Sequence, residues 1–491
     1  MVTLPEAKLY INGVVRGAAG NRTYDTIGPW TGEVVGKAAD ASPADVEEAI
    51  ATARKAFDTT DWSTNHSLRH SLLTKLRDLL AANKQRLYDI AQHEIGSAQA
   101  FIAMAQVDGA IGGFSTLLEV FKSLKWEEDR GPVQFPGLKF DRIVIHEAIG
   151  VVGAITPWNV PLYVNIAKVA SGLLAGCTLI LKPAPSTPSM ATILGELAAE
   201  AGFPPGVFNV ITAKDPVMAG ETLVTDPRVD LITFTGSTGV GKLIMEKGAQ
   251  SLKRVFLELG GKSANIILDD APDFAGTVER AGTATVSHAG QGCAIFSRLL
   301  VPQSRYPEAL KALEKAYANY GDAAWGDPKA PTHVMGPVNS KQQQERVLSY
   351  IEIGKKEGAR LLAGGKARPD RGGGFFVEPT CFVDVKNTMR IAQEEIFGPV
   401  IVVIPFKDDE DAIRIANESN YGLAGGVVSG DKARAMRVAR RIRAGNISAN
   451  GGLMIMPDLP FGGYKHSGIG REWGLEGIEE YMETKVIAVG V

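Results

Sequence analysis

A cysteine between two small residues occupies position 293, in the stretch GQGCAIFSR. Gly292 and Ala294 leave its thiol open to another molecule, and a deprotonated thiol is a strong nucleophile. Cys177 and Cys381 bring the total to three cysteines in 491 residues, so no disulfide framework is expected. A reducing cytosol keeps such thiols free, and a buried free cysteine usually packs as a small hydrophobe. The neighbours of Cys293 therefore mark it as the candidate nucleophile.

Polar side chains also stand at the predicted ends of strands. Asn159 lies in ITPWNVPL, Lys182 in LILKPAPSTP and Glu258 in FLELGGKS. Taken singly, each has a structural explanation as a turn residue, a solvated strand end or a helix-capping carboxylate. Glu258 differs because it interrupts the otherwise apolar run VFLEL. A buried carboxyl group has a raised pKa, which a base working near neutral pH requires.

The elements that must position these residues follow from the apolar pattern of residues 146–257. Short apolar strands, such as VIHEAIGVVGAIT, TLILKPAP, VDLITFTGS and VFLELGG, alternate there with helical segments. Such alternation predicts parallel βαβ units in an open α/β sheet, which binds ligands at the carboxyl ends of its strands. A second alternation, with the strands SANIIL, FVEPTCF, VIVVIPF and GGVVSG, predicts a second α/β domain over 258–447.

The flanking segments have patterns of their own. Ser42 is a predicted N-cap, with Pro43 at the first helical position, and helical patterns continue to about Ile95. Residues 124–146 are predicted to form a hairpin excursion. The chain ends on an apolar strand, EEYMETKVIAVGV, that has no neighbour in sequence. Such a strand needs a partner from elsewhere, for example another subunit.

Composition places limits on the partners. Hydrophobic residues make up 45% and charged residues 22% of the chain, and the net charge is −3. This balance gives no reason to expect nucleic acid or an anionic membrane as a partner. No signal-type stretch opens the sequence and no apolar run reaches the length of a membrane span. A cytoplasmic protein is therefore expected.

The turn FTGSTGVGKL offers a nucleotide-binding alternative. Gly236 through Lys242 nearly fits a phosphate-binding P-loop, and the apolar segment ending at Asp269 resembles a magnesium-binding strand. However, the final P-loop position must supply a hydroxyl group to Mg²⁺, and it is Leu243 here. What remains is a glycine-rich turn at a helix N-terminus, which suits a phosphate that needs no bound metal. No metal site is predicted.

The segments PWNVPL, GCTLILKPA, FTGSTGVG, LELGGKSA, GQGC, EEIFGPV and PFGGYKHSGIGRE follow one another along nearly the whole chain. In content, order and spacing they resemble the aldehyde dehydrogenase superfamily. The resemblance implies a Rossmann-like, open parallel-sheet cofactor domain (1–123 and 147–257) and a second α/β catalytic domain (258–447). It also implies a small β oligomerisation extension (124–146 and 478–491), with 448–477 returning to the cleft between the domains. A homodimer or homotetramer is the implied assembly.

The resemblance assigns roles to the candidate catalytic residues. The thiolate of Cys293 adds to an aldehyde carbonyl, and the oxyanion is stabilised by the Asn159 side-chain amide and the Cys293 backbone N–H. Collapse of the thiohemiacetal expels hydride to a nicotinamide and leaves a thioester. Glu258 is the implied base for the water that hydrolyses it. Where some relatives carry a further glutamate, this chain has Leu475, with Glu476 one place off.

The resemblance also assigns a cofactor, NAD. Lys182 is expected on the adenine ribose, Ser237 on the pyrophosphate, Glu395 on the nicotinamide ribose and Phe397 against the nicotinamide. The remaining residues expected to line the cofactor cleft are Ile155, Trp158, Pro185, Phe234, Gly236, Val240 and Leu259. Pro185 replaces a glutamate that many NAD-preferring members use on the ribose hydroxyls, which leaves NADP open as an alternative.

The expected aldehyde tunnel is apolar. Its lining is expected from Val160, Tyr163, Ala167, Ile295, Met454 and Ile455. Since no arginine is placed to hold a carboxylate, an apolar aliphatic or aromatic aldehyde is favoured over a dicarboxylic semialdehyde. The alternatives are an acylating enzyme that passes the thioester to coenzyme A, a nucleotide-independent cysteine hydrolase using His288, and a non-catalytic lens-type or scaffold protein.

Overall fold

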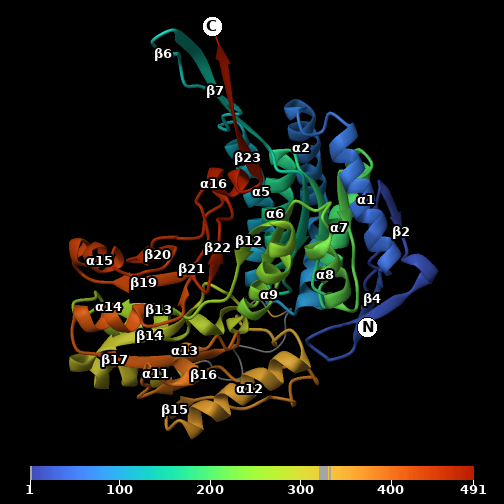
Figure 1. Cartoon of the computed structure of the whole chain (residues 1–491). Coiled ribbons are helices and arrows are strands. Elements are labelled where there is room, and N and C mark those ends of the chain that lie inside the picture. The colour runs from blue at the N-terminus through green and yellow to red at the C-terminus, as the bar shows by residue number, and fades with distance from the viewer. Residues whose placement is uncertain (1–2, 320–329, 331–332, 491) are drawn as a thin grey trace.

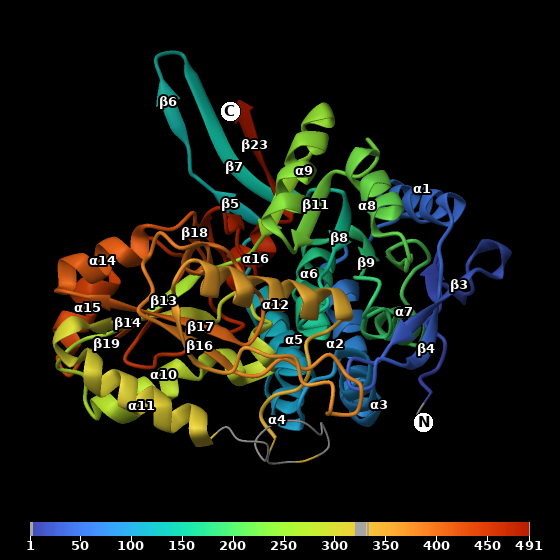
Figure 2. The ribbon, with the colours of Figure 1, turned by 90° about the horizontal axis from the view of Figure 1, so that it is seen from below.

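The described residues, 3–319, 330 and 333–490 of a computed structural model, form two large helix-covered sheets and an antiparallel arm (Figure 1). Figure 2 shows the same arrangement from below, with the arm again projecting from the body. Each large sheet is mainly parallel, as the alternation of strands and helices predicts. The α/β fold class expected from the sequence is confirmed.

The first sheet has the strand order β2-β1-β10-β9-β8-β11-β12-β22. The five neighbouring strands β10, β9, β8, β11 and β12 run parallel. Strands β1, β2 and β22 are antiparallel to their neighbours. The bounds of the strands are β1 (Leu9–Ile11), β2 (Val14–Arg16), β8 (Val151–Ile155), β9 (Thr178–Lys182), β10 (Phe208–Val210), β11 (Leu231–Thr235), β12 (Arg254–Glu258) and β22 (Gly468–Ile469).

Helices cover both faces of the first sheet because side chains alternate along its buried strands. Val152 and Ala154 pack toward α6 and α7, backed by α2 and α5, whereas Val151 and Ile155 pack toward α1 and α8. The helices of this half are α1 (Pro43–Thr59), α2 (His66–Ala82), α3 (Lys84–Ile90), η2 (Ala91–Ile95), α4 (Gln99–Phe101), η3 (Ile102–Gln106), α5 (Asp108–Phe121), α6 (Pro161–Ala175), α7 (Ser189–Ala201), α8 (Pro216–Thr225), α9 (Thr238–Gly248), η4 (Ala249–Ser251) and α16 (Gly474–Glu479).

The second sheet has the order β15-β16-β17-β14-β13-β19-β20, and only the β15–β16 pair is antiparallel among its described strands. Its strands are β13 (Ser263–Ile267), β14 (Phe296–Pro302), β15 (Arg360–Ala363), β16 (Thr380–Val383), β17 (Val400–Phe406), β19 (Ala424–Val428) and β20 (Asn446–Ala449). Its helices are α10 (Phe274–Gly282), η5 (Ala284–Gly290), η6 (Gln303–Arg305), α11 (Tyr306–Asn319), α12 (Lys341–Lys356), α13 (Arg390–Gln393), α14 (Asp409–Asn417) and α15 (Lys432–Ala439).

The chain joins the two halves twice. It passes from β12 of the first sheet directly into β13 of the second. After β20 it returns, and β22 pairs with β12 through Leu257↔Ile469 and Glu258↔Gly468. The return of 448–477 to the first sheet agrees with the path expected from the sequence, while the division into domains stays a prediction.

The arm contains β5 (Glu127–Asp129), β6 (Val133–Phe135), β7 (Leu138–Ala148) and β23 (Met482–Gly490). The C-terminal strand takes the partner that it needs from a distant part of its own chain, whereas another subunit had been the expected example. It pairs with β7 from Met482↔Ala148 to Gly490↔Phe140. Smaller pairs join β3 (Thr23–Ile27) to β4 (Val34–Ala39) and β18 (Tyr421–Gly422) to β21 (Tyr464–Lys465), and η1 (Ala19–Asn21) is a short turn.

Some boundaries differ from the predicted ones. The expected helix start is confirmed, since Ser42 forms a capping box with Asp45 and Pro43 opens α1. The stretch VIHEAIGVVGAIT, predicted as one strand, is divided between β7 and β8 at Gly150. Gly150 has φ +135°, and a Cβ there would lie 1.9 Å from a carboxylate oxygen of Asp230. The arm therefore extends to Ala148, two residues past the expected boundary.

The helical run Gln99–Phe121 is, by length and composition alone, apolar enough to cross a membrane, and half of its apolar window is buried inside the structure. Phe114, Leu117 and Leu118 of this run belong to the core that also contains α6. A buried core helix meets the same criteria of length and apolarity. This run is accordingly part of the packing beneath the first sheet.

Candidate active site

The strand order of the first sheet determines where its loops gather. In the sheet, β9 and β10 lie on one side of β8, and β11 and β12 lie on its other side. Loops after β8 and β11 therefore leave toward opposite faces, which opens a crevice at the carboxyl ends of these strands. Asn159 lies in the loop after β8, and Ser237 follows β11. This reversal places the predicted site residues at the usual ligand-binding edge.

Asn159 connects the first sheet to the loop that carries Cys293. Its side-chain Nδ2 donates to the Gln291 carbonyl at 2.9 Å, and Asn159 is 7% exposed. Gln291 comes two residues before Cys293, between η5 and β14. The structure thus brings together the predicted nucleophile and the predicted oxyanion donor from different sheets. One of the two Nδ2 hydrogens remains available for a substrate.

Glu258 ends β12 beside this loop. It is 2% exposed, and its Oε1 has no hydrogen-bond partner among the described residues. Burial raises the pKa of Glu258 well above its ordinary value, and the Glu472 carboxylate raises it further; Lys168 and a hydrogen bond with Cys293 act in the opposite direction. The turn after Glu258 approaches closely, since a Cβ at Gly261 would lie 2.3 Å from the Cys293 carbonyl oxygen. These are the properties of a buried base.

Cys293 differs from the other cysteines in exposure. Cys293 is partly exposed, whereas Cys177 and Cys381 are both fully buried. Burial raises the pKa of the Cys293 thiol well above its ordinary value, and the carboxylates of Glu258, Glu395 and Glu472 raise it further. The resting residue is therefore a thiol. Burial also raises the pKa of Cys177, to about 12, and its Sγ contacts the Tyr481 carbonyl at 3.3 Å, as in a packing residue.

A buried ion pair that sequence reasoning missed lies behind Glu258. Lys168 of α6 donates to Glu472 at 2.5 Å and to the Thr233 hydroxyl at 2.9 Å. Lys168 is fully buried and Glu472 is 5% exposed. The carboxylate beside Glu258 thus comes from Glu472, not from position 475 or 476; Glu476 is exposed. A charged residue in the middle of the apolar helix NIAKVASGLL is the sequence signal that could have found Lys168.

The predicted cofactor residues are spread along the same crevice. Lys182 ends β9 and is 2% exposed; burial lowers its pKa to about 8, and its Nζ contacts only the Pro183 carbonyl, at 3.3 Å, among the described groups. Ser237 caps α9, accepting a bond from the Val240 amide at 3.4 Å. Val240 is 44% exposed. Among the other predicted lining residues, Ile155, Phe234 and Leu259 are buried, and Pro185 and Gly236 are partly exposed.

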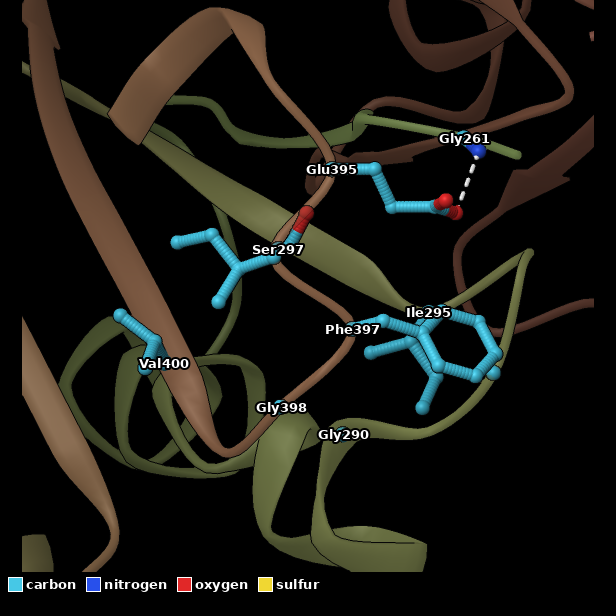
Figure 3. A pocket seen from close by; sticks show the side chains of 10 residues that line it. Gly261, Gly290, Ile295, Ser297, Glu395, Phe397, Gly398 and Val400 are labelled. Carbon is cyan, nitrogen blue, oxygen red and sulfur yellow. Dashed lines mark hydrogen bonds between the residues drawn. The ribbon is translucent and has the colours of Figure 1, made fainter. Parts of the chain in front are cut away.

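The opposite wall of the crevice comes from the second half of the chain. Glu395 is partly exposed, but desolvation by its surroundings raises its pKa to about 7, and its Oε1 accepts a 2.8 Å bond from the Gly261 amide (Figure 3). Phe397 packs edge-on against Trp158, with ring centroids 5.3 Å apart. Glu395 and Phe397 line one pocket together with Ile295. Ile295 therefore lies on the predicted nicotinamide side as well as beside the nucleophile.

The predicted tunnel residues are not equally accessible. Val160, Tyr163 and Met454 are partly exposed, and Ile455 is 40% exposed. Ala167 is 2% exposed and belongs to the core around α6, so it offers little open space. Tyr163 packs on Trp473 with ring centroids 4.5 Å apart. The tunnel assignment stays a prediction, with Trp473 as an aromatic neighbour that the sequence did not indicate.

The two alternative sites are not assembled in the structure. Lys242 lies exposed on α9, while Asp269 follows β13 of the other sheet and pairs with Arg434 at 2.7 Å. No P-loop magnesium site joins them. His288 uses its Nε2 in a bond with the Asn159 carbonyl at 2.8 Å, and no hydrogen bond between His288 and Cys293 is found among the described residues. No group of three or more His, Cys, Asp or Glu side chains suited to a metal is found in the described part of the chain.

A family model for the aldehyde dehydrogenase family matches residues 15–487. The chain belongs to the aldehyde dehydrogenase family. It is 41% identical over 488 residues to aldehyde dehydrogenase 1 of Tanacetum cinerariifolium, a match covering 99% of this chain and 95% of that relative. The prediction of the family and of an aldehyde oxidoreductase is thereby confirmed.

Solved structures of family members match the whole fold. The aldehyde dehydrogenase of Mycobacterium tuberculosis complexed with NAD⁺ is 40% identical with a TM-score of 0.93, covering 99% of this chain and 98% of the other. A mutant aldehyde dehydrogenase C of Pseudomonas syringae complexed with NAD⁺ and octanal is 37% identical with a TM-score of 0.91, covering 98% and 96%. The likeness extends to the arm as well as to both large sheets.

Proposed function

We propose that this chain oxidises an aldehyde to a carboxylate, with NAD⁺ as the hydride acceptor, through a covalent intermediate on Cys293. The observation that carries the proposal is that Cys293 hydrogen-bonds with Glu258, whose Oε1 has no partner among the described residues, and that the Asn159 amide bonds to Gln291 of the same loop. A nucleophile, an oxyanion donor and a buried base in contact are the parts needed for acyl transfer to water. An acylating enzyme that uses coenzyme A has no need of the base.

The first half-reaction uses Cys293 and Asn159. After the Cys293 thiol loses its proton to solvent, the thiolate attacks the aldehyde carbon, and the free Nδ2 hydrogen of Asn159 and the Cys293 backbone N–H stabilise the oxyanion. The Gln291 carbonyl holds the other Nδ2 hydrogen at 2.9 Å, so the amide cannot rotate away. Collapse of this adduct releases hydride and leaves a thioester on Cys293. In the second half-reaction, Glu258 accepts a proton from the water that attacks the thioester, and the C–S bond breaks to release the carboxylate and free Cys293.

The residues present fit a dinucleotide. Lys182 is a buried cation without an ion-pair partner among the described residues, which suits ribose hydroxyls, and the Ser237 end of α9 suits a pyrophosphate. Glu395 and Phe397 would hold the nicotinamide end, where the cofactor supplies the hydride acceptor. NAD⁺ is also bound in the solved structures of the M. tuberculosis and P. syringae relatives. Because Pro185 leaves no carboxylate to repel a 2′-phosphate, NADP⁺ is the second candidate.

A rapid-mixing experiment with Glu258→Gln tests the mechanism. The variant is expected to release about one equivalent of reduced cofactor per site in a fast first turnover and then to stall, because hydrolysis lacks its base. Cys293→Ala should give neither burst nor turnover, and Cys177→Ala, a matched cysteine control, should resemble the wild type. Loss of the burst in Glu258→Gln would assign Glu258 to deprotonation of the thiol instead. Activity retained by Cys293→Ala would refute the covalent route.

We further propose an apolar aliphatic or aromatic aldehyde as the substrate. Val160, Ile295, Met454 and Ile455 offer apolar contact and no charge, and the P. syringae relative was crystallised with octanal. Each buried methylene contributes about 0.8 kcal/mol, so kcat/KM should rise up to roughly fourfold per carbon until the tunnel is full. A panel of straight-chain and aromatic aldehydes, assayed with each dinucleotide, measures this. A preference for acetaldehyde or a charged semialdehyde over hexanal and benzaldehyde contradicts the apolar tunnel.

A further inference from the structure

The backbone carbonyl of Asn159 accepts two side-chain hydrogen bonds. Gln106 Nε2 donates to it at 2.7 Å, and His288 Nε2 lies 2.8 Å from it. Gln106 comes from η3 and His288 from η5, so the donors reach the loop after β8 from different halves of the molecule. Both donors are buried, His288 at 4% and Gln106 at 0% exposure. Together with the Gln291 bond to Nδ2, they hold Asn159 at both its backbone and its side chain.

The protonation of His288 follows from this contact. A carbonyl oxygen only accepts, so Nε2 carries the hydrogen and donates it. Burial lowers the pKa of His288 to about 4, so the ring is neutral in the working range of the enzyme and Nδ1 carries no hydrogen. His288 is therefore a fixed hydrogen-bond donor here and offers no cation or base to Cys293.

The backbone around His288 is held in an unusual shape. His288, Ala289 and Gly290 have φ values of +50°, +51° and +71°, all in the left-handed region. Successive non-glycine residues in this region are strained, and such strain persists only where surrounding contacts impose it. The His288 ring stacks on Phe101 with centroids 4.3 Å apart and an interplanar angle of 6°, and its Nε2 bond fixes the other end. This strained turn leads directly into Gln291 and Cys293.

We infer that His288 and Gln106 are positioning residues that hold the Asn159 amide over Cys293 for oxyanion stabilisation. The inference depends on the proposed role of Asn159. Through Asn159 the pair acts on the first half-reaction, in which the oxyanion forms, and not on binding of the dinucleotide. A hydrogen bond to the backbone rather than to the amide itself leaves the amide free for the substrate.

The experiment measures the rate of the first turnover by rapid mixing in His288→Phe, which keeps an aromatic ring beside Phe101 but removes the donor. The rate is expected to fall roughly tenfold, the size of one hydrogen bond, while the affinity for NAD⁺ is unchanged. Gln106→Leu should slow the same step. Because the backbone at Gln106 is not left-handed, this variant tests the inference even if the histidine variant misfolds. His288→Gln, whose amide Nε2 can donate, should recover most of the rate.

A double-mutant cycle with Asn159→Ala separates positioning from general damage. Because His288 acts through Asn159, His288→Phe should slow the wild type but leave the already slow Asn159→Ala enzyme unchanged. An equal loss in both backgrounds, or no loss in the wild type, overturns the inference. If Asn159→Ala itself has a normal first turnover, the proposed oxyanion role fails and the inference fails with it. A slow Asn159→Ala beside unaffected His288 and Gln106 variants overturns the positioning role alone.

Discussion

The thiol of Cys293 lies among groups that oppose its ionisation. Burial and the carboxylates of Glu258, Glu395 and Glu472 all raise its pKa. A thiolate is the reactive form toward aldehydes and also toward oxidants, so a protonated resting state protects the nucleophile at the expense of speed. The same burial raises the pKa of Glu258, which fits it to accept a proton near neutral pH. Desolvation thus raises the pKa of both residues.

This raised pKa of Glu258 predicts the pH dependence of turnover. Only the ionised carboxylate accepts a proton from water, and burial shifts that ionisation to higher pH than in an exposed glutamate. With hydrolysis rate-limiting, kcat should therefore rise with pH through the raised pKa and level off above it. The measurement is kcat against pH for the wild type and Glu258→Gln. An acid limb at the ordinary glutamate value, or one that persists in Glu258→Gln, contradicts the assignment.

Sequence reasoning at the residue scale predicted the candidate catalytic groups and missed the residues that contact them. Cys293, Glu258 and Asn159 were predicted because each lies in a short motif with its own chemical signature. Gln106 lies in no such motif, and Gln291 is part of GQGC but has no chemical signature of its own, since a glutamine gives no sign of which distant group it will meet. Their contacts with Asn159 and Asn339 are tertiary. Only the fold reveals them.

At the scale of elements, hydrophobic pattern predicted the long buried strands and missed the short ones. β8, β9, β11 and β17 are apolar runs of five to seven residues between turn signals, which a pattern can identify. β1 and β2 have three residues each, and β22 has two. Such short strands are stabilised by pairing with neighbouring strands, so the local sequence alone does not predict them. β22 matters nonetheless, because it anchors the segment that carries Glu472 beside Glu258.

The pairing of β22 with β12 and the burial of α6 bring Glu472 and Lys168 behind Glu258 with opposite effects on its pKa. Glu472 raises that pKa, so Glu472→Gln should move the acid limb of kcat to lower pH. Lys168 lowers it, so Lys168→Met should move the limb to higher pH. Opposite displacements of the two pH profiles are the expected result. If both pH profiles shift in the same direction, or neither shifts, Lys168 and Glu472 do not set the pKa of Glu258 electrostatically.

Stability provides the control for these variants. Each single substitution leaves one buried charge unpaired, at a cost of about 3–5 kcal/mol, so both should lower Tm. The double variant Lys168→Met/Glu472→Gln removes both charges and should be more stable than either single variant. Its pH profile should lie between theirs. Thermal unfolding measured beside kcat therefore distinguishes a displaced pKa from partial unfolding.

At the scale of the whole molecule, the arm is the part whose open edge and exposed apolar side chains are not covered within a single chain. β23 pairs with β7 on one side only and lies at the edge of the sheet formed by the described residues. Apolar side chains on the arm are open to solvent, including Phe135 at 57%, Leu138 at 59% and Val486 at 68% exposure. A projecting sheet with an open edge and apolar residues is prone to pair with another chain. The sequence predicted association through an unpaired terminal strand, and in the structure this strand is already part of a sheet within the chain.

We therefore expect the chain to form a homodimer or homotetramer that buries the arm. Light scattering after size-exclusion chromatography should give a mass that is a multiple of the 52.3 kDa chain. Val486→Lys places a charge on the outer strand of the arm and should lower that mass, because burying an unpaired charge is costly. Val14→Lys, at a residue 55% exposed on β2 of the body, is the matched control and should leave the mass unchanged. A wild-type protein that runs as a monomer, or a Val486→Lys variant that keeps its assembly, would show that the arm is not the contact between subunits.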